Sequence, residues 1–261
     1  MMFMIQPNDG FEWTQEPWGP ALRCAALGTI ADHLFTTANL QLVDDAGEWN
    51  AVAARMGVGE EKLRLIRQVH GADVAVGSDG EAVHAQRPRA DIVISDDPGV
   101  AIAVRVADCA PILLADRRLR AVGAVHAGWR GTARGAATRA VRAMTETFAS
   151  DARDLVAAIG PCLGPCCGEV GPEVVAEFRA AGYAGVDLER WFSAGPGLRP
   201  YLNLWRANRD QLEMAGIPAA QIHAAGLCTR SHPSVFHSYR AQGRRAGRMA
   251  GIIRAGQNSS A

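Results

Sequence analysis

Short apolar runs rich in valine, isoleucine and alanine recur through the middle of the chain and predict buried strands. Runs of this length, bounded by turn residues, are typical of strands that are covered on both faces. The predicted strands are residues 91–95, 100–106, 112–115, 121–125, 155–159 and 222–225.

Helical periodicity lies between these strands. Across residues 132–148 the apolar side chains recur every three or four positions and trace one helix face. A second helix begins with Pro172 in its first turn, and a third covers about residues 204–215 and ends at Gly216 and Pro218. Because the strands cluster instead of alternating strictly with helices, we expect an α+β fold, a layered sandwich of mixed β-sheets flanked by helices.

The chain of 261 residues contains no linker, low-complexity tract or short repeat that would divide it. Its length is enough to bury a substantial core. We therefore expect a single domain over residues 1–261, in which residues 255–261 form a frayed tail.

The composition argues against several classes of protein. Hydrophobic residues make up 48% and charged residues 21%, and the formal net charge is zero, so no general attraction to nucleic acid or membrane is predicted. No apolar stretch reaches the roughly 18–20 residues of a membrane-spanning helix, and the first residues lack the basic region of a secretion signal. Six cysteines in a chain this long do not suggest a disulfide scaffold. We expect a cytoplasmic monomer or small homo-oligomer with no nucleic-acid or membrane partner.

Three separated segments each end an apolar run with a residue that can bind a metal. These residues are His70, Cys109 and His126. If the three strand ends meet, they offer two imidazoles and one thiolate, a set suited to zinc that leaves a fourth coordination position open. Divalent copper would bind the same atoms, although we regard it as the less favoured metal. Such an open site predicts an enzyme.

A second group of cysteines, Cys162, Cys166 and Cys167, has the spacing C-x3-C-C. That spacing differs from the C-x2-C pairs of a zinc ribbon, and we interpret the group as structural packing. The remaining histidines are expected to be surface or structural residues: His33, His84, His223, His232 and His237.

The turn after His126 combines features of an anion site. Glycines allow close approach of the backbone, Thr132 is a candidate cap for the following helix, and Arg130 adds a forked donor suited to phosphate. A plain capped turn is the alternative. Asp108, beside Cys109, is a candidate acid–base carboxylate, and Asp73 and Asp91 are weaker candidates.

The basic strip near the C-terminus divides into two parts. Arg240 is our preferred pocket residue, whereas Arg244 and Arg245 are interpreted as a solvated basic segment.

Several motifs together resemble the YfiH-like laccase-domain family, once described as multi-copper polyphenol oxidases and now as zinc-dependent purine nucleoside phosphorylases. The resemblance rests on the order and spacing of residues 67–71, 106–111, 124–131, 159–171, 226–229, 237–240 and 247–250.

The resemblance implies a layered fold of packed sheets with helices outside, and zinc ligands at His70, Cys109 and His126. It implies phosphorolysis or deamination of adenosine, inosine and methylthioadenosine, with inorganic phosphate as the second substrate. We predict that Cys109, His126 and Asp108 are catalytic. For substrate and phosphate we expect contacts from Arg130, Asn39 and Arg240.

Departures from the family pattern concern substrate recognition. A glycine-rich loop usually precedes the Asn-Leu pair, but here Ala38 follows Thr37 directly, and Gly168 stands where an aromatic residue is usual.

Two other enzyme classes are alternatives. A cysteine-dependent amide hydrolase that edits cell-wall precursors would use Cys109 as nucleophile and His126 or His70 as base. A copper polyphenol oxidase is less favoured because the chain contains no His-x-His segment to hold a trinuclear cluster. A non-catalytic metal-bound scaffold is the remaining alternative.

Overall fold

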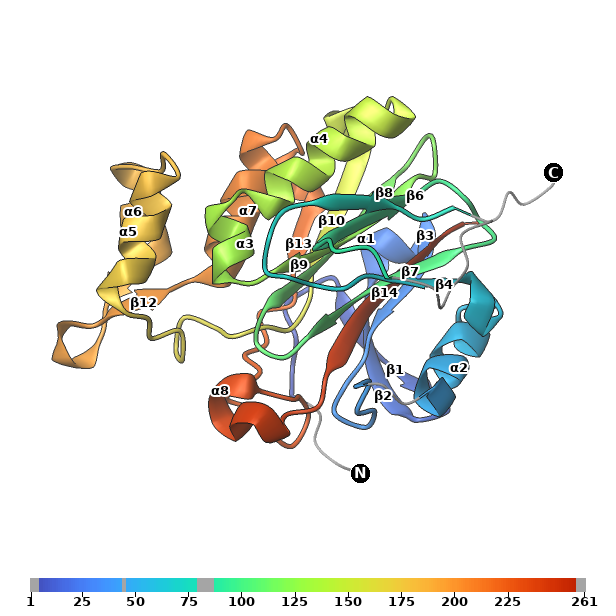
Figure 1. Cartoon of the computed structure of the whole chain (residues 1–261), viewed down its shortest axis with the longest axis horizontal. Helices are drawn as coiled ribbons and strands as arrows, with labels where there is room; N and C mark the ends of the chain where they lie inside the picture. The colour runs from blue at the N-terminus through green and yellow to red at the C-terminus, as the bar shows by residue number, and fades with distance from the viewer. Residues whose placement is uncertain (1–4, 44–45, 79–86, 257–261) are drawn as a thin grey trace.

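The computed structural model describes residues 5–43, 46–78 and 87–256. Two six-stranded sheets pack face to face, and helices cover the outer faces (Figure 1). This arrangement confirms the α+β layered sandwich. The strands are β1 Phe11–Glu16, β2 Gly19–Cys24, β3 Ala31–Phe35, β4 Leu63–Leu65, β5 Val74–Val76, β6 Ile92–Ser95, β7 Ala101–Val106, β8 Ala110–Asp116, β9 Val122–Ala127, β10 Leu155–Ile159, β11 Phe192–Ala194, β12 Pro200–Leu202, β13 Ile222–Ala224 and β14 Met249–Ala255.

Both large sheets are mixed. The first has the order β1-β2-β3-β14-β7-β4 and is antiparallel except where β4 runs parallel to β7. The second has the order β13-β10-β8-β9-β6-β5, with β13 parallel to β10 and β5 parallel to β6. Strands β11 and β12 form a separate hairpin.

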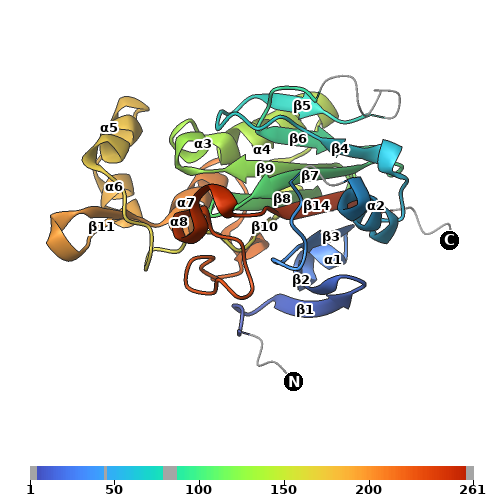
Figure 2. The ribbon, with the colours of Figure 1, turned by 60° about the horizontal axis from the view of Figure 1, so that its bottom comes forward.

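The helices form two outer layers and a side projection. Helix α2 packs on the first sheet, and α3, α4 and α7 cover the second, while α5 and α6 lie to one side in both views (Figures 1 and 2). The helices are α1 Ala25–Gly28, α2 Ala46–Arg55, α3 Trp129–Ala133, α4 Ala136–Phe148, α5 Pro172–Ala180, α6 Val186–Trp191, α7 Leu204–Met214 and α8 Tyr239–Gln242. Among the described residues, no helix has the length and apolar character needed to cross a membrane.

The hydrophobic core is divided by the sheets into layers. One cluster lies between the second sheet and its helices, and a second lies between the two sheets, where Phe35, Leu113 and Phe236 are fully or almost fully buried. A third cluster fills the space between α2 and the first sheet. Strands β8 and β9 are buried on both faces, which is why their sequences are continuous apolar runs.

Two connections cross from the first sheet to the second at the same end of the sandwich. Because β4 and β7 are parallel, both end at this edge, and the chain continues from them to β5 and β8 in the other sheet. Strand β9 is antiparallel to β8, and Ala127 at its end pairs with Ala110 at the start of β8. The ends of β4, β7 and β9 are therefore brought together, as the sequence predicted.

Three local expectations were wrong. Residues 132–148 form two helices, because Gly135 adopts a left-handed conformation with φ of 71°. Thr132 does not cap α3; Gly128 takes that position and the Thr132 side chain is buried against Asn208. Ala255 belongs to β14 and pairs with Ala31, so the chain is still ordered there; residues 257–261 lie outside the described residues.

Candidate metal centre and its arginine-lined pocket

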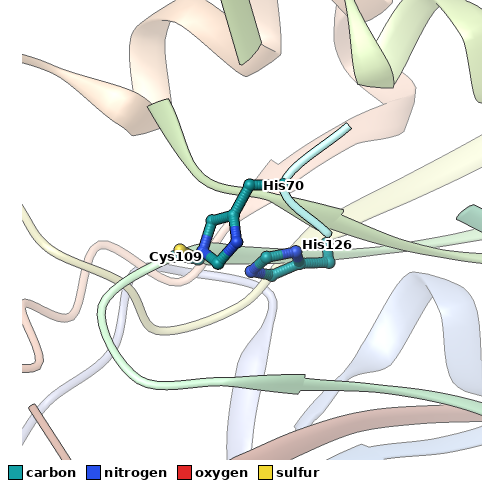
Figure 3. Close-up of side chains that lie close together, drawn as sticks. All are labelled: His70, Cys109 and His126. Carbon is teal, nitrogen blue, oxygen red and sulfur yellow. The ribbon is translucent and has the colours of Figure 1, made fainter. Parts of the chain in front are cut away.

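His70, Cys109 and His126 meet where the two crossover connections pass the end of β9. Their side chains point toward one another (Figure 3), and their potential ligand atoms lie within 4.8 Å of one another. The two imidazole rings are 4.8 Å apart between centroids and nearly perpendicular, at 77°. His126 is buried, Cys109 is half-buried and His70 is exposed, so the cluster opens to solvent on the His70 side.

The backbone at this cluster is unusual. His70 has φ of 59° and Asp108, next to Cys109, has φ of 80°. Non-glycine residues adopt positive φ rarely, at a cost on the order of 1–3 kcal/mol each, and keep it where surrounding contacts fix the chain. Both crossover connections thus carry a strained residue at the point where they approach His126.

Asp91, at the start of β6, is the group that fixes this geometry. Its buried carboxylate accepts hydrogen bonds from the backbone N–H groups of Val69 (3.1 Å), His70 (2.9 Å) and Gly71 (2.6 Å). The same carboxylate accepts from His126 Nδ1 at 2.7 Å. One side chain therefore holds the loop of one candidate ligand and the ring of another, and it leaves His126 Nε2 for the Cys109 side. Sequence reasoning ranked Asp91 too low.

The charges of the cluster are coupled. Burial alone would raise the pKa of the Cys109 thiol, but the His126 charge and hydrogen bonds from both imidazoles lower it to about 6. Burial would lower the pKa of His126, but the Cys109 thiolate and the Asp91 hydrogen bond raise it to about 9. Without metal, the site therefore favours a thiolate facing an imidazolium near neutral pH, and Cys109 needs no further deprotonation to act as a ligand.

The residues present fit a zinc ion. Two imidazoles and one thiolate are zinc ligands, and a carboxylate on the distal nitrogen of one imidazole is the usual outer partner of such a ligand. Gly128 keeps space beside the sulfur: a Cβ atom there would lie 2.6 Å from Cys109 Sγ. Glycine at position 128 therefore leaves the Cys109 sulfur accessible.

A cavity of about 940 Å³ opens from the cluster. Asp108 is the acidic residue in its wall, which otherwise carries many cationic side chains. Among the described residues, no carboxylate lies within 4.0 Å of any of six arginines in this wall. They are Arg67, Arg130, Arg240, Arg244, Arg245 and Arg248.

The chain matches the family model described as multi-copper polyphenol oxidoreductase laccase over residues 33–256. It belongs to this family. A purine nucleoside phosphorylase of Deinococcus radiodurans is 36% identical, over 91% of this chain and 93% of that protein. Adenosine deaminase RL5, from an unknown prokaryotic organism, is 35% identical over 78% of this chain and 79% of its own length. The crystal structure of Bacillus licheniformis YfiH covers 95% of this chain and all of its own, with 25% identity and a TM-score of 0.84.

Of the three residues predicted to contact the substrate, two line the cavity and one does not. Arg130 lies in the cavity wall with its guanidinium 4.1 Å from the centre of the Trp129 ring, a cation–π contact. Arg240 also lines the cavity, and its Nη1 donates to the Cys167 carbonyl. Arg244 and Arg245 are exposed, as expected of a solvated basic segment, and they also line the cavity.

Asn39 does not reach the cavity. Its side chain packs against Gly19, where a Cβ atom would lie 2.5 Å from Asn39 Nδ2, and its Oδ1 accepts from the Thr37 hydroxyl. Gln41, two residues later, lies in the wall instead.

Asp108 lies in the wall but its carboxylate is already engaged. Oδ1 accepts from the Thr229 hydroxyl at 2.6 Å, and Oδ2 accepts from the Arg240 backbone N–H at 2.5 Å. The side chain therefore fixes the start of α8 against the Cys109 connection, and its contacts favour a positioning role for this predicted acid–base residue.

The other cysteines and histidines differ in how deeply they are buried. Cys162 is fully buried, as expected for packing, but Cys166 is exposed and Cys167 half-buried, so packing does not describe them. His33 is a buried structural residue whose Nε2 accepts from the Cys24 backbone N–H at 2.9 Å. His84 lies outside the described residues.

Proposed function

We propose that this protein is a zinc-dependent purine nucleoside phosphorylase. The observation that carries the proposal is the opening of the His70–Cys109–His126 cluster into a cavity whose wall concentrates cationic side chains. Phosphorolysis requires phosphate to be bound beside the nucleoside, and the cationic wall offers contacts for phosphate next to a cluster that could hold a Lewis-acidic zinc ion. The names of relatives such as that of Deinococcus radiodurans, which spans most of this chain, support the same reading.

The reaction transfers the ribose from the purine to phosphate. A phosphate oxygen attacks the anomeric carbon, the glycosidic carbon–nitrogen bond breaks, and the purine nitrogen leaves with the bonding pair and takes up a proton. Arg130 and Arg240 would hold the phosphate oxygens by charge-assisted hydrogen bonds, in a wall where Asp108 is the one acidic residue among the described lining residues. Asp108 would position Arg240 through the backbone contact at 2.5 Å.

Zinc would be held by His70, Cys109 and His126 and would supply Lewis-acid chemistry at the cluster. Asp91 keeps the His126 ring oriented by accepting from Nδ1, and the Cys109 thiolate balances part of the added charge. Copper binding to the same atoms follows the general affinity order of divalent metals, but the described residues offer no further histidine cluster for a multinuclear copper site.

A deaminase activity on adenosine is a second candidate on the same site. The observation that favours it is the accessible fourth position of the cluster on the exposed His70 side, together with the similarity to adenosine deaminase RL5. Water would replace the exocyclic amine, which leaves as ammonia. Simultaneous measurement of inosine, free purine and ammonia from adenosine separates the two reactions.

The cysteine-hydrolase alternative rests on the Cys109–His126 pair, which resembles an activated nucleophile and base. Metal dependence distinguishes the two, because a nucleophilic thiolate works without zinc. We also place the protein in the cytoplasm, as a monomer or small homo-oligomer; the six free thiols are consistent with a reducing compartment.

The test is a comparison of metal content and phosphorolysis in a His70→Ala/Cys109→Ala/His126→Ala variant. We expect it to lose about one zinc ion per chain and the phosphate-dependent release of purine from adenosine and inosine. His223→Ala, a histidine on β13 away from the cavity, is the matched control and should change neither. Unchanged zinc content in the triple variant would overturn the proposal.

A further inference from the structure

Three cysteines from two distant segments converge at the surface beside the cavity. Cys166 and Cys167 follow the turn after β10, and Cys228 follows β13, yet their sulfur atoms lie within 4.8 Å of one another. All three are free thiols. The segments are aligned by a β-bridge between Cys162 and Cys228, so the convergence is built into the backbone.

A hydroxyl group completes the cluster. Ser231 Oγ lies 3.4 Å from Cys166 Sγ and 3.5 Å from Cys167 Sγ, and the two sulfurs are 3.7 Å apart. In a tetrahedral zinc site with bonds of about 2.3 Å to sulfur and about 2.0 Å to oxygen, sulfurs are about 3.8 Å apart and oxygen is about 3.5 Å from sulfur. These three distances match one face of such a tetrahedron, and the Cys228 sulfur lies within 4.8 Å of the other two sulfurs.

Burial and polar contacts separate this cluster from a packed core. Cys166 and Ser231 are exposed and Cys167 is half-buried, so an ion has access, whereas Cys228 is buried and fixed. The Gly164 N–H···Sγ contact is 3.3 Å. This contact holds the Cys228 sulfur in place beside the other two cysteines.

We propose that Cys166, Cys167 and Cys228 form a second zinc site, in which the Ser231 hydroxyl or a water molecule takes the fourth position. Zinc displaces the thiol protons to solvent on binding, with no change of oxidation state. This site is separate from the His70–Cys109–His126 cluster and does not depend on the proposed catalytic activity.

The position of the site gives it a structural consequence. The Cys167 carbonyl accepts from Arg240 Nη1 at 3.2 Å, and Thr229, next to Cys228, donates to Asp108. Both contacts belong to the wall of the cavity. A metal ion that links the two cysteine segments would therefore also stabilise the position of Arg240 and Asp108 in this wall.

The experiment measures zinc per chain in reduced, desalted protein for four forms. Wild type should bind about two ions, the triple variant of the first cluster about one, Cys166→Ser/Cys228→Ser about one, and the combined variant none. Cys162→Ala is the matched control, because Cys162 lies in the same segment but is fully buried outside the cluster, and it should retain both ions.

Cobalt substitution provides a second readout, which does not depend on the number of zinc ions that the purified protein retains. Thiolate-to-cobalt charge-transfer absorption grows with the number of sulfur ligands, and the first cluster offers one thiolate where the second offers three. Cys166→Ser/Cys228→Ser should therefore remove most of this absorption while leaving the cobalt bound by the first cluster. A wild-type protein with only one zinc ion, lost in the first-cluster variant, would overturn the proposal and leave the proposed function intact. Thiols that form a disulfide and bind no metal when reduced would also overturn it.

Discussion

The hydrogen bonds of Asp91 allow a sharp test of how the metal cluster is held. Its carboxylate accepts from the N–H groups of Val69, His70 and Gly71 and from His126 Nδ1. His70 and His126 donate to Oδ1, while Val69 and Gly71 donate to Oδ2. Each oxygen therefore receives two donors, and no position is available for an NH₂ group.

Asp91→Asn keeps the size of the side chain but replaces one of these acceptors with a donor. If the NH₂ group replaces Oδ2, it faces two backbone N–H groups and the His70 loop must move. If it replaces Oδ1, His126 must accept at Nδ1, and its proton moves to Nε2, the nitrogen on the Cys109 side. Either outcome weakens metal binding, and loss of such an outer partner typically costs ten- to a hundredfold in affinity, or about 1.4–2.7 kcal/mol.

The assay is a competitive titration of zinc between the protein and a chromophoric chelator at pH 7. Asp73→Asn is the matched control, since Asp73 lies in the same connection with an exposed side chain. We expect a ten- to hundredfold lower affinity of the first cluster in Asp91→Asn and less than about a twofold change in Asp73→Asn. Equal affinities in the two variants would refute the assignment of Asp91 as the group that orients His126.

Three further predictions follow from particular contacts. Gly128→Ala should abolish zinc retention by the first cluster in the same titration, because the new Cβ would lie 2.6 Å from Cys109 Sγ; a variant that folds and keeps full affinity would contradict this. Arg130→Ala should raise the KM for phosphate roughly ten- to a hundredfold, and more than the KM for nucleoside, because a charge-assisted hydrogen bond is worth about 1.5–3 kcal/mol. Arg139→Ala on α4 is the control. An equal rise in both KM values would count against a phosphate contact. Burial lowers the pKa of His33 to about 4, so the native state binds fewer protons at this residue than the unfolded chain does. The free energy of unfolding should therefore fall as the pH drops from about 6.5 through 4, by up to about 3 kcal/mol. Urea unfolding of wild type and His33→Gln across this range checks the sign, and a pH slope that is the same in both would exclude His33 as its source.

The strands of the second sheet could be predicted because they are covered on both sides. β8, β9 and β10 are continuous apolar runs, and a run of that kind is visible in the sequence alone. The first three strands were not predicted. β1 has only its ends buried, and β2 begins with Gly19 and Pro20, residues that usually mark turns. Their strand structure depends on pairing with each other and with β3.

The convergence of the three candidate metal ligands could be predicted for a topological reason, and the carboxylate that supports them could not. His70, Cys109 and His126 each follow an apolar run, and strand ends gather at a sheet edge whatever the details of packing. Asp91 begins a strand, 21 residues from His70 and 35 from His126, and nothing in its local sequence shows which backbone groups it will meet. Asn39 shows that a motif position does not fix the direction of a side chain, because this side chain packs against Gly19 and is not among those that line the cavity.

The arginines show why overall charge is a poor guide to a site. The formal net charge of the chain is zero, which argued against any general attraction to anions. Yet the cavity wall gathers Arg67, Arg130, Arg240 and four more arginines from segments far apart in the sequence, with Asp108 as its acidic residue. Because salt screens exposed charges over about 8 Å at physiological ionic strength, an anion near the mouth responds to these arginines and much less to compensating carboxylates elsewhere. We therefore expect the cavity wall of this formally neutral protein to attract phosphate, and to do so more strongly at low than at high salt.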